Sequence, residues 1–443
     1  MKVLVLVDGE HYPAVTRWGI EAARAMGHEV LAALFLGGTE KIDAGGLPDL
    51  GVETLTAADS LPEGLANAIE RVRPEAVLDL SDEPVLGYRE RMELVGVSLA
   101  RGVPYIGPDF RFDPPVTGAP LAVPTIAVIG TGKRTGKTAV AGQLARVAAA
   151  ADANPIVVAM GRGGPPSPQI AEAGSVTVQR LLELVALGHH AASDYLEDAL
   201  TSGVTTVGAR RSGGGLAGAP YVTNTREAAE VAVRAGAGLV ILEGSGAAVP
   251  SVPWDAGILV VPASAPPEYL GGYLGPFRLL LSDLVVFTMI VGPNSGPEDL
   301  SALKSHVQRW HEDARFVVTE FEPVPLGDVR GKSVFLTTTA PPAVADEQIA
   351  RLEAAEGCRV VGWSANLADR SRLAEDMEGT GDYEVLLTEL KAAAVDVACR
   401  TALDRGAEVV FMDNRAVTVG DGDEVALHLE WVVDLARERG NAR

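Results

Sequence analysis

Short runs of apolar, largely β-branched residues alternate along the chain with segments whose apolar residues recur at helical spacing. Several runs are too short for a helix and end at glycine, proline or an acidic residue, as "KVLVLVD" does at Asp8, which is typical of buried strands in a parallel sheet. Strands that alternate with helices predict doubly wound α/β units. The first unit contains the predicted strands "KVLVLVD", "HEVLAALFLGG" and "AVLDLSDEP".

A proline-rich stretch, "PDFRFDPPVTGAPLAVP", interrupts this alternation, and a linker is predicted at about residues 109–122. The alternation restarts with "TIAVIG", and a long helical stretch is predicted from roughly Ser167 to Ala199. The sequence thus predicts a Rossmann-like domain over 1–120 and a second domain with a mainly parallel sheet over 121–300. Residues 301–443 form a C-terminal α/β region, which is either a third domain or completes the sheets of the others.

Composition narrows the possible partners. The chain has 443 residues, 47% of them hydrophobic, and a formal net charge of −22, which repels nucleic acid and anionic membranes at long range. The two cysteines, Cys358 and Cys399, lack metal-binding spacing and are predicted to be buried thiols. The apolar run in "MKVLVLVDGE" is too short for a secretory signal or a membrane span, so a cytoplasmic protein is expected.

The string "GTGKRTGKT" stands between the strand "TIAVIG" and a helix predicted over Gly136–Ala150. Glycines let the backbone wrap a phosphate, and the helix N-terminus adds partial positive charge. Thr131 replaces the first glycine of the usual GxxxxGK[ST] motif. The GT-x4-GKT form resembles the P-loop of dethiobiotin synthetase and its relatives, so residues 121–300 are predicted to be a P-loop NTPase domain. The predicted ATP contacts are Gly132, Thr135, Gly136, Lys137, Thr138 and Ala139.

A P-loop also needs a magnesium site. The Thr138 hydroxyl is one expected Mg²⁺ ligand, and an acidic partner is expected at the end of a neighbouring strand. Glu243 in "LVILEGSG" is the best candidate, acting directly or through a metal-bound water. Asn294, which follows a late strand, is a weaker candidate for contacting adenine.

Two further glycine-rich stretches carry arginine. "MGRGGPPSP" contains Arg162, and the second, "VGARRSGGG", contains Arg210 and Arg211. Arginine presents a planar fork that suits phosphate or carboxylate, although one such loop is usually a surface turn. Three basic loops exceed what ATP alone needs, so the sequence predicts a second, polyanionic substrate. Lys133 and Arg134, inside the P-loop, are predicted to face the γ-phosphate or that substrate.

Two other stretches have candidate residues. Asp8, Glu10 and His11 in "LVDGEHYP" follow the first strand, where ligands bind in open α/β sheets. A capped, solvated loop is the alternative there. Lys391 in "ELKAAAVDVACR" is a candidate substrate contact, with a solvated helix face as the alternative.

Five stretches that extend over nearly the full chain carry a further signal; in order, they are "VLVDGEHYPAVTRWGIE", "GTGKRTGKTAV", "ILEGSGAAVPSVPWDA", "ELKAAAVDVA" and "VVFMDNR". Together they resemble the cyclic 2,3-diphosphoglycerate synthetase family. The resemblance implies that ATP, with Mg²⁺, activates one phosphate of 2,3-bisphosphoglycerate as an anhydride. The second phosphate then attacks it, and a cyclic anhydride, ADP and inorganic phosphate result. The P-loop branch commonly pairs its subunits, so the resemblance also favours a homodimer.

Two other functions remain open on the sequence alone. One is an ATP-dependent kinase or ligase acting on another anion, including phosphorylation of 2-phosphoglycerate. The other is a nucleotide switch that binds a protein partner. The three basic loops and the additional α/β domain argue against a switch, because a switch has little use for substrate-facing arginines.

Overall fold

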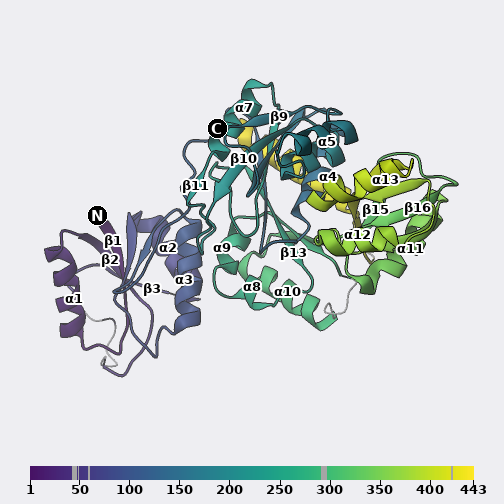
Figure 1. Ribbon diagram of the computed structural model, residues 1–443. Coiled ribbons are helices and arrows are strands. Elements are labelled where there is room, and N and C mark those ends of the chain that lie inside the picture. The colour runs from purple at the N-terminus through teal and green to yellow at the C-terminus, as the bar shows by residue number, and fades with distance from the viewer. Residues whose placement is uncertain (42–46, 48, 58–59, 291–296, 421–422) are drawn as a thin grey trace.

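The computed structural model describes residues 1–41, 47, 49–57, 60–290, 297–420 and 423–443. Within these ranges the protein is α/β with two mostly parallel sheets, so the predicted fold class is confirmed (Figure 1). Asn294, the predicted adenine contact, lies outside the described residues. None of the helices in the described part of the chain combines the length and apolar character that crossing a bilayer requires.

The N-terminal unit is a six-stranded sheet with the order β3-β2-β1-β4-β5-β6. Its strands are parallel except for the antiparallel pair β5–β6. They span Lys2–Val7, Glu29–Phe35, Thr54–Thr56, Ala76–Asp79, Tyr105–Ile106 and Arg111–Phe112 for β1 to β6. The helices of this unit are α1 (Pro13–Ala25), α2 (Leu61–Val72) and α3 (Tyr88–Ala100). Local chemistry sets their starts: Pro13 opens α1, and the Ser60 hydroxyl caps α2 by accepting from the Glu63 amide at 3.3 Å.

The second sheet contains the P-loop strand β7 near its middle, in the order β11-β10-β8-β12-β7-β13-β14-β15. These strands span Thr125–Gly130 (β7), Pro155–Gly161 (β8), Thr206–Ser212 (β10), Val222–Thr223 (β11), Leu239–Glu243 (β12), Ala256–Pro262 (β13), Leu284–Thr288 (β14) and Arg315–Pro325 (β15). The helices between them are α4 (Lys137–Ala150), α5 (Val178–Ala186), α6 (Asp194–Ser202), α7 (Thr225–Arg234), α8 (Glu268–Gly271), α9 (Gly275–Leu280) and α10 (Pro297–Trp310). Strands β7 and β12 are fully buried and apolar except for Thr125 and Glu243, because helices cover both faces of the sheet.

Strand β15 joins this sheet to the C-terminal lobe. Its first residues pair in parallel with β14, and Thr319–Pro325 pair in antiparallel fashion with β19. The sheet then continues as β19-β18-β16-β17. The lobe contains β16 (Ser333–Thr337), α11 (Pro342–Glu356), β17 (Arg359–Ser364), α12 (Arg370–Glu378), β18 (Val385–Thr388), a π-helical turn (Ala394–Cys399) that leads into α13 (Arg400–Asp404), and β19 (Glu408–Thr418). The last helix, α14 (Val425–Asn441), returns to pack on α4, β7 and β13.

The chain between β8 and β10 differs from the prediction. Instead of one long helix over about 167–199, it forms β9 (Gln169–Ala171) followed by α5 and α6. Gly174 and Gly188 adopt positive φ values of 73° and 75° and interrupt the helical path. The Thr177 hydroxyl then caps a new helix by accepting from the Arg180 amide at 3.2 Å.

The N-terminal unit packs on the P-loop part of the protein through α3 and α9, which lie side by side in Figure 1. A Cβ built on Gly96 of α3 would lie 3.2 Å from the backbone nitrogen of Phe277, so the two helices approach closely. The Arg309 guanidinium of α10 donates to the buried Glu93 carboxylate of α3 at 3.0 Å. The apolar cores of the two parts are continuous across this contact.

Candidate active site

Four neighbouring parallel strands, β10, β8, β12 and β7, end at one edge of the large sheet. The residues at or just after those ends are the ones that the sequence marked as candidates. They are Arg211 on β10, Arg162 after β8, Glu243 on β12 and the P-loop after β7. Because parallel strands direct their carboxyl ends to one side, the fold gathers candidates that are more than 100 residues apart in the chain.

The P-loop contains a glycine that the packing requires. Gly136 has a φ of 90°, and a Cβ there would lie 2.4 Å from the phenyl Cζ of Phe321 on β15. Beyond it, Thr138 and Ala139 lie in the first turn of α4. Lys133 and Arg134 are exposed in the middle of the loop, and Arg134 adopts a φ of 61°.

The Lys137 side chain is buried within the loop, with 7% of its surface exposed. Its ammonium donates to the Gly132 carbonyl at 2.7 Å and to the Thr135 hydroxyl at 3.1 Å. Burial lowers the pKa of Lys137 to about 8, although the negative charge of Glu243 partly offsets it. A phosphate in the loop would add further negative charge beside this buried cation.

The predicted magnesium ligands meet directly. The Thr138 hydroxyl donates to Oε1 of Glu243 at 2.6 Å. Glu243 is 4% exposed, and burial first, then the charge of Asp194, raises its pKa to about 7. A hydroxyl beside a buried carboxylate fits Mg²⁺, a hard cation that prefers oxygen ligands.

Asp198 of α6 adds a second carboxyl group beside Glu243, and its side chain is fully buried. In the described part of the chain, no hydrogen-bond donor reaches either of its carboxyl oxygens. Burial and the neighbouring Glu243 charge raise the pKa of Asp198 well above its ordinary value. A neutral Asp198 would avoid placing two negative charges in one buried position, so the two carboxyl groups can lie side by side.

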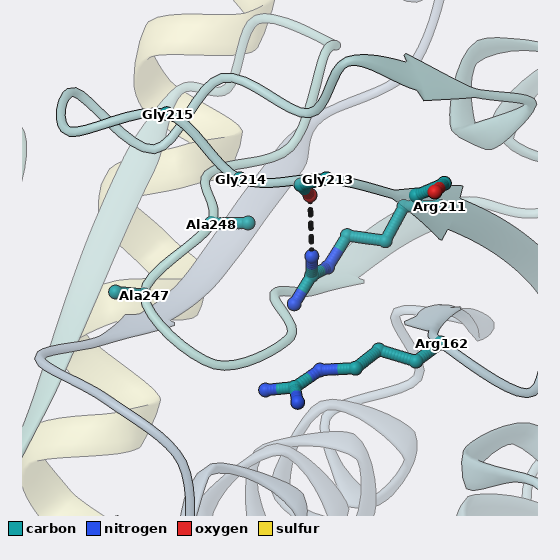
Figure 2. A pocket seen from close by; sticks show the side chains of 8 residues that line it. Arg162, Arg211, Gly213, Gly214, Gly215, Ala247 and Ala248 are labelled. Atoms are coloured by element: carbon teal, nitrogen blue, oxygen red, sulfur yellow. Dashed lines mark hydrogen bonds between the residues drawn. The ribbon is translucent and has the colours of Figure 1, made fainter.

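Next to the P-loop, Arg162 and Arg211 line a cavity of about 500 Å³ together with the glycine loop that follows β10 and the loop that follows β12. Figure 2 shows both arginine side chains extending toward the loop of Ala247 and Ala248. A Cβ built on Gly246 would lie 3.0 Å from Nη2 of Arg162 and 3.3 Å from Nη2 of Arg211. The two guanidinium groups therefore converge at one point of the cavity.

Arg211 is held in place by oxygen acceptors of both loops. Its guanidinium donates to the Gly213 carbonyl at 2.7 Å and to the Ser245 carbonyl at 2.8 Å. Burial, followed by the like charge of Arg162, lowers its pKa. Two neighbouring guanidinium groups that donate only to hydroxyl and carbonyl oxygens among the described residues are suited to an anionic group.

Arg210 and Arg211, which the sequence placed together in a loop, lie within strand β10. Successive side chains of a strand point to opposite faces, so Arg211 is buried toward the cavity and Arg210 is exposed on the other face. The Nε of Arg210 donates to the Gly164 carbonyl at 2.7 Å. Arg210 is not among the residues that line the cavity.

Comparison with known proteins shows the family to which the chain belongs. Three family models match, described as the N-terminal domain (residues 2–113), the P-loop domain (125–320) and the C-terminal domain (325–415) of cyclic 2,3-diphosphoglycerate synthetase. The chain belongs to the cyclic 2,3-diphosphoglycerate synthetase family. The resemblance inferred from the sequence is therefore confirmed.

Relatives that bear the family's name match along the full chain. The protein of Rubrobacter xylanophilus is 46% identical over 450 residues, covering 100% of this chain and 99% of its own. That of Methanothermobacter thermautotrophicus is 42% identical over 455 residues, with 100% and 98% covered. That of Thermococcus kodakarensis is 43% identical over 429 residues, with 95% and 96% covered.

The N-terminal candidate residues Asp8, Glu10 and His11 follow a strand of the N-terminal sheet, whereas the P-loop follows a strand of the second sheet. Asp8 is 3% exposed, and its Oδ1 accepts from the amides of Glu10 at 2.9 Å and His11 at 3.1 Å. The same oxygen contacts Nδ1 of His11 at 2.9 Å, and Oδ2 accepts from the Asp82 amide at 2.7 Å. Asp8 thus fixes two loops at the end of the N-terminal sheet, and none of the three candidates lines the arginine cavity.

Lys391 follows β18, and its ammonium donates to both Glu197 oxygens of α6, at 2.5 and 2.7 Å. Burial alone would lower the pKa of Lys391, but the charges of Glu197 and Glu389 outweigh it and raise the pKa. Lys391 therefore already has a carboxylate partner, and it connects the C-terminal lobe to α6.

Sequence reasoning missed the contribution of α6. Asp194, Glu197 and Asp198 are spaced i, i+3 and i+4, so they share one helix face. This face lies between the pair Lys137–Glu243 and Lys391, and Asp194 acts electrostatically on all three. The spacing of the acidic residues in "SDYLEDAL" is the signal that the sequence offers, but one long helix over about 167–199 does not present α6 as a separate element.

Proposed function

We propose that this protein closes 2,3-bisphosphoglycerate to cyclic 2,3-diphosphoglycerate at the expense of ATP, releasing ADP and inorganic phosphate. Relatives named for this activity match its full length. The observation that carries the proposal is the cavity at Arg162 and Arg211, which lies at the same sheet edge as the P-loop. A polyanion bound there would be adjacent to the phosphates of a bound nucleotide.

The chemistry requires two transfers. An oxygen of one substrate phosphate attacks the γ-phosphorus of ATP, the bond to ADP breaks, and a phosphoanhydride forms. An oxygen of the other substrate phosphate then attacks the inner phosphorus of that anhydride. The ring closes and inorganic phosphate leaves, so ATP supplies the whole driving force.

The difficulty of this reaction is electrostatic, because phosphates and a carboxylate must come within bonding distance of one another. Lys137 would contact the β- and γ-phosphates, and Arg162 and Arg211 would hold the substrate phosphates. Lys133 and Arg134 are exposed on the loop and free to approach the γ-phosphate. Thr138 and Glu243 would hold Mg²⁺, which neutralises phosphate charge when bound. Catalysis would therefore consist of positioning and charge stabilisation.

Phosphorus NMR tests the proposal. Purified protein is incubated with ATP, Mg²⁺ and 2,3-bisphosphoglycerate, with a Lys137→Met variant as the control. We expect upfield resonances of a cyclic phosphoanhydride, together with ADP and inorganic phosphate, in the wild-type sample alone. Unchanged bisphosphate resonances would refute the cyclase function.

A parallel sample with 2-phosphoglycerate separates this function from simple phosphorylation. ADP formation with 2,3-bisphosphoglycerate as the product, and no cyclic product from the first sample, would identify a kinase. The homodimer favoured by the resemblance stays a prediction, which light scattering of the same preparation would test.

A further inference from the structure

Arg278 of α9 is a buried guanidinium that the proposed reaction does not yet use. It is 7% exposed, and in the described part of the chain its Nε has no hydrogen-bond partner. Its remaining nitrogens donate to backbone carbonyls: Leu274 at 3.1 Å, Ala247 at 2.8 Å and Leu216 at 3.4 Å. Burial lowers the pKa of Arg278 to about 10, and no carboxylate among the described residues opposes this effect.

Two of these carbonyls belong to the loops that form the arginine cavity, which Arg162 and Arg211 line. Ala247 lines the cavity directly, and Leu216 follows the lining residue Gly215. The loops also meet each other, because the Val249 amide donates to the Gly218 carbonyl at 2.9 Å. A Cβ on Gly218 would lie 3.3 Å from Nη2 of Arg278, so the guanidinium lies where the two loops come together.

A purely structural role does not explain the charge. Burying a cation without an acidic partner is costly, and neutral groups could also satisfy three carbonyls. The cost is compensated if an anion occupies the cavity on the other side of the loops, since the field of Arg278 then adds to that of Arg162 and Arg211. The substrate of the proposed reaction carries two phosphates and a carboxylate.

We propose that Arg278 is a positioning residue for the acidic substrate: it fixes the two loops of the cavity and adds a buried positive charge behind them. The inference rests on the proposed function. Arg278 should act on binding of the acidic substrate and not of the nucleotide, because two of the three carbonyls that it holds belong to the cavity loops and none belongs to the P-loop. It also links the cavity to the N-terminal unit, since the neighbouring residue Phe277 packs against Gly96 of α3.

Isothermal titration of the full chain tests this inference. 2,3-Bisphosphoglycerate is titrated into enzyme saturated with ADP and Mg²⁺, and ADP is titrated in a separate experiment. For Arg278→Met we expect the dissociation constant of the bisphosphate to rise about tenfold or more, with that of ADP within about twofold of wild type. Arg278→Lys keeps the charge but lacks the fork, so it should recover part of the affinity.

Arg226→Met is the matched control, because Arg226 also donates to a backbone carbonyl, that of Ala119, but lies on the surface of α7. It should leave both dissociation constants unchanged. Equal weakening of ADP and bisphosphate in Arg278→Met, or no change in either, would overturn the inference. If Arg278→Met does not fold, Arg278→Lys is titrated instead. Its dissociation constant for the bisphosphate should rise about threefold or more, and that for ADP should stay unchanged.

Failure of the proposed function would be seen in the wild-type enzyme and not in the variants. If the wild-type enzyme does not bind 2,3-bisphosphoglycerate, the cyclase function fails. Inorganic pyrophosphate, titrated into the ADP-saturated enzyme, then probes the cavity in its place. Selective weakening of pyrophosphate by Arg278→Met would support the positioning role, and unchanged or absent pyrophosphate binding would overturn it.

Discussion

The Thr138 hydroxyl donates a 2.6 Å hydrogen bond to Oε1 of Glu243, and this contact joins the first turn of α4 to the end of β12 across 105 positions of the chain. The two groups were predicted separately as magnesium ligands. Their contact means that a change in either one alters the oxygen environment of the other.

Replacing Thr138 with valine should therefore impair the use of magnesium. Valine keeps the shape of threonine but lacks the hydroxyl, so we expect turnover to fall by at least about tenfold and the Mg²⁺ concentration for half-maximal rate to rise. Thr138→Ser, which retains the hydroxyl, should stay near wild type. ADP release measured across a Mg²⁺ series checks this, and identical Mg²⁺ curves for wild type and Thr138→Val would contradict it.

Replacing Lys137 with methionine should remove activity and spare the fold. Among the described residues, the hydrogen bonds of the ammonium go to the loop itself, at Gly132 and Thr135, so its expected partner in catalysis is the transferring phosphate. We expect turnover to fall about 1,000-fold. The melting temperature of the ligand-free protein should be equal or higher, because a buried charge is removed. Turnover within a factor of a few of wild type would reject the P-loop assignment.

The neighbours Arg210 and Arg211 offer a matched pair. Arg211→Met should raise the KM for the acidic substrate about tenfold while leaving the KM for ATP nearly unchanged, because Arg211 lines the cavity. Arg210→Met should have the smaller effect, since that side chain lies on the opposite face of β10 and donates to the Gly164 carbonyl. Steady-state kinetics with each substrate varied in turn checks this. Equal effects of the two substitutions would mean that the strand alternation does not govern access to the substrate.

The raised pKa of Glu243 implies that the free energy of unfolding depends on pH. Burial raises its pKa from 4.5 to about 7, so the folded protein keeps a proton that the unfolded chain releases. The free energy that this proton contributes is fully present below pH 4.5 and is lost as the pH rises through 7, by about 3 kcal/mol. Glu243→Gln cannot titrate and should lack this component.

The contribution of Glu243 to the free energy of unfolding is measured by urea unfolding in the presence of a chelator, at several pH values between 4.5 and 8. The difference in unfolding free energy between wild type and Glu243→Gln should decrease as the pH rises. Parallel curves for the two proteins would show that Glu243 does not hold a proton in the folded state.

The local pattern was sufficient where function depends on a short stretch of backbone. A buried strand, a glycine-rich loop and a helix beginning near Lys137 predicted the P-loop correctly, because the conformation of such a loop is set by glycines and by the helix N-terminus. The alternation of strands and helices predicted the α/β class for the same reason. Gly174 and Gly188 are also visible in the sequence, but the helical spacing of the residues around them favours one continuous helix, which the structure does not form.

What a side chain faces could not be read from the sequence. Whether Arg210 or Arg211 points into the cavity depends on the phase of strand β10, and Lys391 meets Glu197 because two distant elements pack together. No local signal distinguishes Arg278, whose function follows from the loops that surround it. The sequence by itself determined the fold class, the phosphate loop and the presence of surplus cations, since these are encoded in neighbouring residues. Only the tertiary structure decided which cations share one cavity, because burial and charge pairing arise from contacts between residues far apart in the chain.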